Sequence, residues 1–94
     1  MRKITAKIIA ALLNRETKTI GNSRTDGTTL YLHDNAIAKV DDRGQLWITN
    51  AGWKSVTTKE RLNGLPGVSI HQKDFTWYLN DKPWNGDWVR INLW

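Results

Sequence analysis

The sequence predicts a single α+β domain over residues 1–94, with an antiparallel sheet of about five to six strands, an N-terminal helix and a short middle helix. Three observations lead to this prediction. Helical spacing of apolar residues is confined to two short segments, period-two alternation fills most of the remaining chain, and turn residues separate the alternating runs. Strands joined by short turns favour an antiparallel sheet over a βαβ arrangement.

The first segment is expected to form a helix over residues 6–14. Ile4, Ile8 and Leu12 repeat at helical spacing, and Thr5 is placed to cap the N-terminus. Residues 16–27 lose this periodicity and are rich in Thr, Gly, Asn and Ser, which predicts either a loop or an irregular edge strand.

A period-two pattern begins at TTLYLH (28–33), where Leu30 and Leu32 share one face of a half-buried strand. The chain is expected to turn at Asp34-Asn35 and again at DDRG, and the strands that follow these turns are AIAKV (36–40) and QLWIT (45–49). Three strands in a meander are therefore predicted.

The middle helix is predicted over TKERLN, residues 58–63. Thr57 and Glu60 have capping-box spacing, and Gly64 fits a left-handed position at the C-terminus of the helix. On this basis Thr57→Ala should cost about 1 kcal/mol. Leu62 and Leu65 are expected to face inward, whereas the charged side chains should face water, namely those of Lys59, Glu60 and Arg61.

Alternation resumes after this helix and predicts a second hairpin that turns at Lys73-Asp74. Its second strand, FTWYL, places Phe75, Trp77 and Leu79 on one inward face. If the terminal DWVRINLW is also a strand, its apolar face carries Val89, Ile91 and Leu93, and its other face carries Trp88, Arg90, Asn92 and Trp94.

Composition narrows the class of protein. The chain has no cysteine, which leaves no disulfide, thiolate nucleophile or cysteine zinc site and favours a reducing cytosol. No apolar stretch is long enough to span a membrane. The net charge of +5 favours an acidic partner, either nucleic acid or an acidic protein surface.

The titratable residues do not predict an active site. His33 and His71 lie on exposed strand positions, and most carboxylates fall in expected turns, so no acid–base pair or metal-ligand spacing is apparent. No glycine-rich phosphate loop is present. We therefore expect no catalytic residue, no metal and no cofactor, and a protein that is not an enzyme.

Tryptophan is unusually frequent, with six residues: Trp47, Trp53, Trp77, Trp84, Trp88 and Trp94. Trp77 shares a face with Leu79 and is expected in the core, and Trp53 is assigned to the core rather than to function. Trp47, Trp88 and Trp94 lie opposite apolar neighbours, which predicts exposed rings. If the N-terminal helix covers that face, these rings are ordinary core instead.

Exposed rings beside cations have two functional interpretations. Trp, Tyr and Arg dominate the energetics of protein interfaces, and rings with Lys or Arg also stack the bases of single-stranded nucleic acid. For nucleic acid, Trp88 with Arg90 would serve, as would Tyr31 with Lys39 and Arg43. The predicted partner-binding residues are Trp47, Lys54, Arg61, Trp88, Arg90 and Trp94.

Four motifs carry a family resemblance: LYLHDNAIAK (30–39), GW (52–53), TTKERLN (57–63), and WYLN followed by WNGDW. With them, residues 31–88 resemble a family of small tailed-bacteriophage proteins to which no activity is assigned. The resemblance implies a phage origin and action in the cytoplasm of the bacterial host.

Together, the residues and the resemblance predict a non-enzymatic phage accessory protein that binds and modulates a host macromolecule, as host-takeover or anti-defence inhibitors do. The expected partner is a host protein or a protein–nucleic-acid complex. The alternative is a single-stranded nucleic-acid-binding protein that uses an aromatic and basic sheet face.

Overall fold

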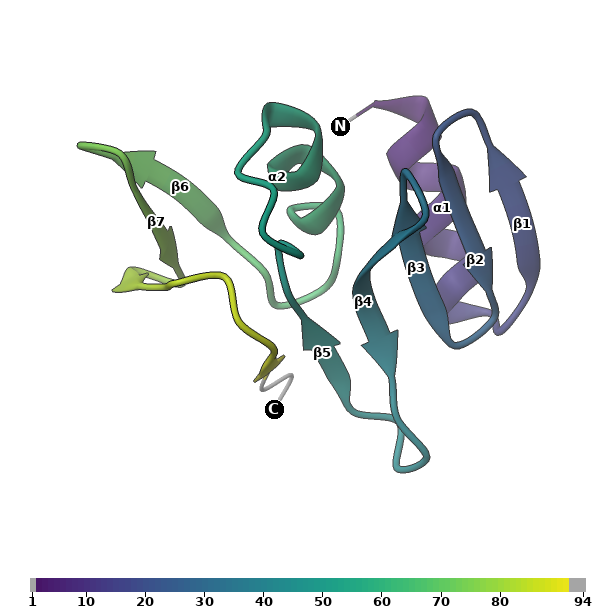
Figure 1. The fold of residues 1–94 in the computed structure, drawn as a ribbon. Helices are drawn as coiled ribbons and strands as arrows, with labels where there is room; N and C mark the ends of the chain where they lie inside the picture. Colours follow the sequence, from purple (N-terminus) through teal and green to yellow (C-terminus); the bar gives the residue numbers. More distant parts are fainter. Residues whose placement is uncertain (1, 92–94) are drawn as a thin grey trace.

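Residues 2–91 are described by the computed structural model (Figure 1). Their elements follow one another in this order: α1 (Lys3–Leu13), β1 (Thr17–Ile20), β2 (Ser23–Asp26), β3 (Thr29–Leu32), β4 (Asn35–Val40), β5 (Leu46–Ile48), α2 (Val56–Leu62), β6 (Ile70–Lys73), β7 (Thr76–Leu79), β8 (Lys82–Pro83) and β9 (Val89–Ile91).

The strands form two antiparallel sheets. The larger has the order β1-β2-β3-β4-β5-β9, so a five-strand meander is completed by β9, which pairs with β5. The smaller has the order β6-β7-β8 and lies at the other end of the molecule from β1 (Figure 1). The predicted α+β class and the sheet of five to six strands are confirmed, and the segment 16–27 supplies β1 and β2. The second sheet was not predicted.

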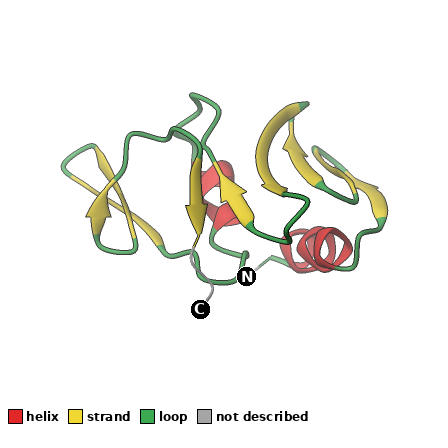
Figure 2. Ribbon diagram, turned by 90° about the horizontal axis from the view of Figure 1, so that it is seen from below, coloured by secondary structure: helices red, strands yellow, loops and turns green. Residues whose placement is uncertain are grey.

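One hydrophobic core joins both helices and both sheets. Figure 2 shows α1 lying along one side of the curved strands β1 to β3. Ile8 and Leu12 from α1 pack in the same buried cluster as Leu30 and Ile48 from the large sheet. The small sheet adds a second group of buried side chains to this cluster, those of Ile70, Trp77 and Leu79. The inward positions predicted by alternation for Leu30, Leu32, Trp77 and Leu79 are confirmed.

The large sheet contains a β-bulge between β3 and β4. Leu30 pairs with Ala38 and Tyr31 pairs with Ala36, so Ile37 is the extra residue of β4. Both Ile37 and Ala38 are buried, although a regular strand would turn one of them outward. The bulge therefore adds apolar volume to the core while Lys39 still points to the opposite face.

Helix α1 begins earlier than predicted, and the predicted cap is wrong. Arg2 occupies the N-cap position without a side-chain hydrogen bond, and the helix starts at Lys3 rather than at residue 6. Thr5 lies inside the first turn, fully buried, and its hydroxyl bonds side chains of α2. A threonine in the first turn of a helix can therefore have the sequence pattern of a cap although its side chain makes contacts with a second helix.

Helix α2 begins at a different cap from the predicted one. The Ser55 hydroxyl accepts the backbone N–H of Thr58 at 3.1 Å, and Glu60 bonds Thr5 and Arg61, so the capping box of Thr57 with Glu60 is wrong. Gly64 does not adopt a left-handed conformation. A glycine is needed at this position because a side chain would not fit: an added Cβ would lie 2.5 Å from the methyl group of Thr5.

We therefore expect Ser55→Ala to cost about 1 kcal/mol of unfolding free energy, because the first turn of α2 loses its side-chain acceptor. Thr57→Ala should change stability by less than about 0.5 kcal/mol, since Thr57 does not supply the cap. Urea unfolding of the two variants tests this order, and a greater loss in Thr57→Ala would restore the original assignment.

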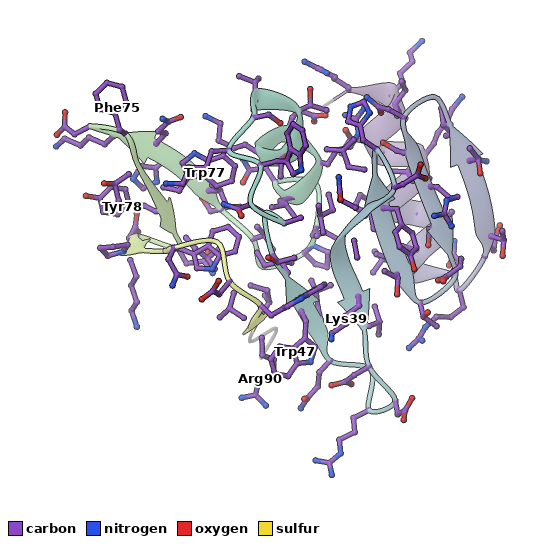
Figure 3. All side chains as sticks on the ribbon, in the orientation of Figure 1. Lys39, Trp47, Phe75, Trp77, Tyr78 and Arg90 are labelled. Carbon is purple, nitrogen blue, oxygen red and sulfur yellow. The ribbon has the colours of Figure 1, made fainter. Side chains whose placement is uncertain are left out.

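Three tight hairpin turns share one geometry, with two consecutive residues at positive φ: His33-Asp34, Asp74-Phe75 and Asn80-Asp81. The turns predicted at Asp34-Asn35 and Lys73-Asp74 are each displaced by one residue, because His33 and Phe75 adopt the left-handed conformation that Asn more often takes. Phe75 therefore lies at the hairpin tip with 88% of its surface exposed, and its predicted core position is wrong. Figure 3 shows Phe75 at this tip.

Candidate functional site

The two faces of the large sheet differ in chemistry. Residues such as Leu30, Leu32, Leu46 and Ile48 face the helices and are buried. The intervening residues face the other way and are half-buried or exposed. Within residues 2–91, both helices pack on the apolar side, so the alternative in which the N-terminal helix covers the aromatic side is not observed.

We call this second surface the open face and define it by three cations and three rings: Arg24, Lys39, Arg90, Tyr31, Trp47 and Trp88. Strand register places several of them directly opposite one another. Arg24 pairs with Tyr31, and Trp47 lies between Lys39 and Arg90 on neighbouring strands. Directly paired side chains in antiparallel strands lie within contact distance. Figure 3 shows Lys39, Trp47 and Arg90 together at one end of the sheet.

Cations lie on rings at two points of the open face. The guanidinium carbon of Arg24 is 4.1 Å from the centre of the Tyr31 ring, and the Lys39 ammonium is 4.5 Å from the centre of the Trp88 ring. Such contacts at exposed sites contribute roughly 0.5–1 kcal/mol each. The contact from Lys39 also places the Trp88 ring beside β4, although Trp88 itself precedes β9. Arg24 makes a further exposed ion pair with Asp34 at 3.6 Å.

The Trp47 ring is held by a carboxylate. Its indole Nε1 donates to Oδ2 of Asp41 at 2.9 Å, and the other oxygen of Asp41 accepts the backbone N–H groups of Arg43 and Gln45. The Trp47 bond, followed by these backbone bonds and the charge of Arg43, lowers the pKa of Asp41. The carboxylate therefore stays ionised to lower pH than usual and fixes the orientation of Trp47.

The predicted partner-binding residues are distributed as follows. Trp47, Trp88 and Arg90 lie together on the open face, and Trp88 has 41% of its surface exposed. Lys54 is exposed beside the small sheet, where it lines a groove with Trp77 and Trp84. Trp94 lies outside the described residues. Arg24 was not predicted as a site residue, because it falls in the aperiodic segment whose faces the sequence does not define.

Arg61 does not face water, and this prediction is wrong. Only 2% of it is exposed, and it connects three elements. Its Nε donates to the Ser23 hydroxyl of β2 at 2.9 Å, and its Nη1 donates to the Thr5 hydroxyl of α1 at 2.8 Å and also contacts Glu60 of α2. We call Thr5, Ser23, Glu60 and Arg61 the buried arginine cluster. Its place between the helices and the sheet gives Arg61 a structural role.

Trp53 is exposed rather than buried, which corrects its assignment to the core. It has 61% of its surface exposed, and its backbone N–H donates to the Asn50 carbonyl within the turn after β5. The residue borders a small pocket with Leu32, Ile37 and Thr58, which are core-side residues. Trp53 therefore lies on the helix-covered side of the sheet, away from the open face.

The titratable side chains are dispersed over the described part of the chain. His33 lies in the turn before β4 and makes a 3.4 Å contact with Asn22, whereas His71 on β6 stacks on Tyr78 with ring centres 5.1 Å apart. Residues 2–91 contain no group of three or more His, Asp or Glu side chains arranged to hold a metal. Their helices include none that is long and apolar enough to cross a membrane.

Fold and surface together define a small α+β protein with one helix-covered sheet face and one open face that carries rings and cations. The sequence model of the Kyanoviridae Gp96 protein family matches residues 1–92, so the chain belongs to this family. The resemblance to small tailed-bacteriophage proteins is thereby confirmed. No curated protein and no solved structure matches the chain.

Proposed function

We propose that this phage protein is a non-enzymatic accessory protein that binds a host macromolecule through the open face, in the cytoplasm of the bacterial host. It would modulate that macromolecule in the manner of host-takeover and anti-defence inhibitors. The observation that supports this function is the alignment of Tyr31, Trp47 and Trp88 with three cations on one face. Trp, Tyr and Arg are the residue types that most often dominate binding energy.

The physical character of the open face also favours binding. The Trp47 ring is already held in the free protein by its bond to Asp41, so little of its side-chain entropy is lost on association. Lys39 and Arg90 are exposed and flank Trp47, which gives the centre of the face a positive charge. An acidic surface is the complementary partner, and the net charge of +5 would accelerate the encounter with it.

A charge-reversal pair tests the function in host lysate. We expect the tagged protein to capture a host macromolecule, and Lys39→Glu with Arg90→Glu to abolish that capture, because the reversed charges repel an acidic partner. The matched control is Lys73→Glu with Lys82→Glu, which changes net charge equally but lies on the small sheet. The control should capture as the unmodified protein does, with both variants shown to be folded by circular dichroism. Equal capture by both variants, or equal loss, would contradict a function at the open face.

A second candidate, the binding of single-stranded nucleic acid, is favoured by one specific observation. Rings and cations alternate across neighbouring strands instead of forming separate apolar and basic patches. This pattern suits a ligand in which flat bases alternate with phosphates.

A further inference from the structure

We propose that the ligand of the open face is single-stranded nucleic acid, with bases stacked on Tyr31, Trp47 and Trp88 and phosphates bound by Arg24, Lys39 and Arg90. This inference rests on the proposed function, because it names the chemical class of the macromolecule that the same face would bind. It does not depend on how that binding serves the phage.

The spacing of rings and cations on the open face suits a single strand of nucleic acid. Tyr31 is on β3 and Trp47 is on β5, with β4 between them. Neighbouring strands lie about 4.8 Å apart, which separates the two rings by roughly 10 Å across the sheet. Tyr31 is also two residues along β3 from Thr29, the partner of Lys39, so the rings are offset by about 7 Å along the strands as well. Lys39 projects from the intervening strand, directly opposite Trp47. A cation on the β-strand between two rings lies where the phosphate backbone of a single-stranded nucleic acid with splayed bases would pass.

The two cation–π contacts are compatible with base stacking. In the free protein Lys39 lies on the Trp88 ring and Arg24 lies on the Tyr31 ring. A base that stacks on either ring displaces the cation, and the cation can then bind the adjacent phosphate. Because an exposed cation–π contact is weaker than a base–ring stack, this exchange favours the complex. The contacts keep the cations beside the rings before the ligand arrives.

Duplex nucleic acid fits this face less well. Bases within a duplex are stacked on one another, so rings on a sheet cannot reach their faces, and groove recognition requires an inserted helix or ribbon. The acidic residues beside the face are occupied, since Asp34 pairs with Arg24 and Asp41 binds Trp47. The charge of Asp34 is therefore paired with a cation, whereas Asp41 stays ionised on a neutral indole and the nearby charge of Arg43 offsets its negative charge.

Fluorescence anisotropy with labelled oligothymidylate of about 12 nucleotides tests the proposal, since this length lies within the usual site sizes for single strands. We expect saturable binding that is tighter than binding to a duplex of equal length. Three bound phosphates predict a slope of about −2 for the logarithm of the association constant against the logarithm of salt concentration. Arg90→Ala should reduce the magnitude of this slope by about 0.7, whereas Lys82→Ala on the small sheet should not change it.

Ring variants separate stacking from charge. Trp88→Ala should weaken oligothymidylate binding roughly 10-fold, and Trp53→Ala should leave it unchanged, because both tryptophans are exposed but only Trp88 is on the open face. Tyr31→Ala provides a second ring variant if Trp88→Ala does not fold.

Three results would overturn the inference: no binding of oligothymidylate, tighter binding to the duplex, or equal effects of Trp53→Ala and Trp88→Ala. If oligothymidylate does not bind but capture from lysate still requires Lys39 and Arg90, the ligand is a protein and the proposed function stands. If capture also survives the charge reversal, both proposals fail.

Discussion

Arg61→Ala is expected to lower the free energy of unfolding by about 3–5 kcal/mol, which is the usual effect of breaking a buried charged network. Arg61 supplies the donors that the hydroxyl of Ser23 and the carboxylate of Glu60 accept. Its removal leaves the Ser23 hydroxyl without a donor and the Glu60 carboxylate without its cation, and it also opens a cavity between α1, α2 and β2. Urea unfolding followed by circular dichroism measures the loss.

Two further variants test whether the loss of stability in Arg61→Ala comes from the buried arginine cluster. Arg43→Ala removes an exposed arginine from a turn and should change stability by less than about 0.5 kcal/mol. Arg61→Lys keeps the charge but cannot reach Ser23 and Thr5 together, so its stability should lie between those of the unmodified protein and the alanine variant. An Arg61→Ala variant as stable as Arg43→Ala would show that the buried arginine cluster is not a structural centre.

The cluster should also weaken in acid. Burial acts to raise the pKa of Glu60, but hydrogen bonds from Thr5 and the Arg2 backbone, together with the charge of Arg61, outweigh burial and lower it. A carboxyl group whose pKa is lowered by folding stabilises the protein above its unfolded pKa, and this contribution is lost as pH falls through the folded pKa. The difference between the unmodified protein and Arg61→Ala should therefore be greatest near neutral pH and shrink below the ordinary pKa of glutamate.

Gly86→Ala is the second substitution with a large expected effect, a loss of roughly 2–5 kcal/mol from backbone strain and overpacking combined. Gly86 has a φ of +92°, and an added Cβ would lie 2.2 Å from the side-chain nitrogen of Asn50. Asn50 is buried and cannot move easily, because its backbone N–H donates to the Gly86 carbonyl at 3.0 Å and its side chain accepts the Gly52 N–H.

Gly44→Ala is the matched control for this effect. Gly44 also has a positive φ, +77°, but an added Cβ would have no atom within 4 Å. This variant should therefore lose only the backbone term, about 1–2 kcal/mol. Thermal unfolding of both variants separates the two contributions, and equal losses would mean that the contact with Asn50 is relieved without cost.

The parts of the fold that follow local rules could be predicted from the sequence. Alternation placed Leu30, Leu32, Trp77 and Leu79 in the core because side chains of a strand point to opposite faces in turn. The same rule placed Trp47 on the polar face of its strand, and Trp88 with Arg90 on the polar face of theirs; the pairing of β5 with β9 then brings them to one surface. Alternation does not specify which strands pair, so it could not show that β9 joins β5 while β6, β7 and β8 form a separate sheet.

The errors arise where tertiary contacts override local preference. Arginine on a short helix usually faces water. Burial of Arg61 is favourable because the hydroxyls of Thr5 and Ser23, distant in sequence, accept from it and the carboxylate of Glu60 pairs with it. Ser55 and Thr57 both have side chains suited to capping, and the position where the chain enters α2 decides between them. Arg24 could not be assigned to the open face because the segment around it lacks an apolar period.

The central claim, that single-stranded nucleic acid binds on the open face, is tested most directly by a titration that resolves each tryptophan. In a ¹H–¹⁵N correlation spectrum, added oligothymidylate should shift the indole N–H signals of Trp47 and Trp88. The signals of exposed Trp53 and of Trp77, which is 1% exposed, should stay in place. Shifts at Trp53 in place of Trp47 and Trp88, or an unchanged spectrum at saturating oligothymidylate, would contradict the claim.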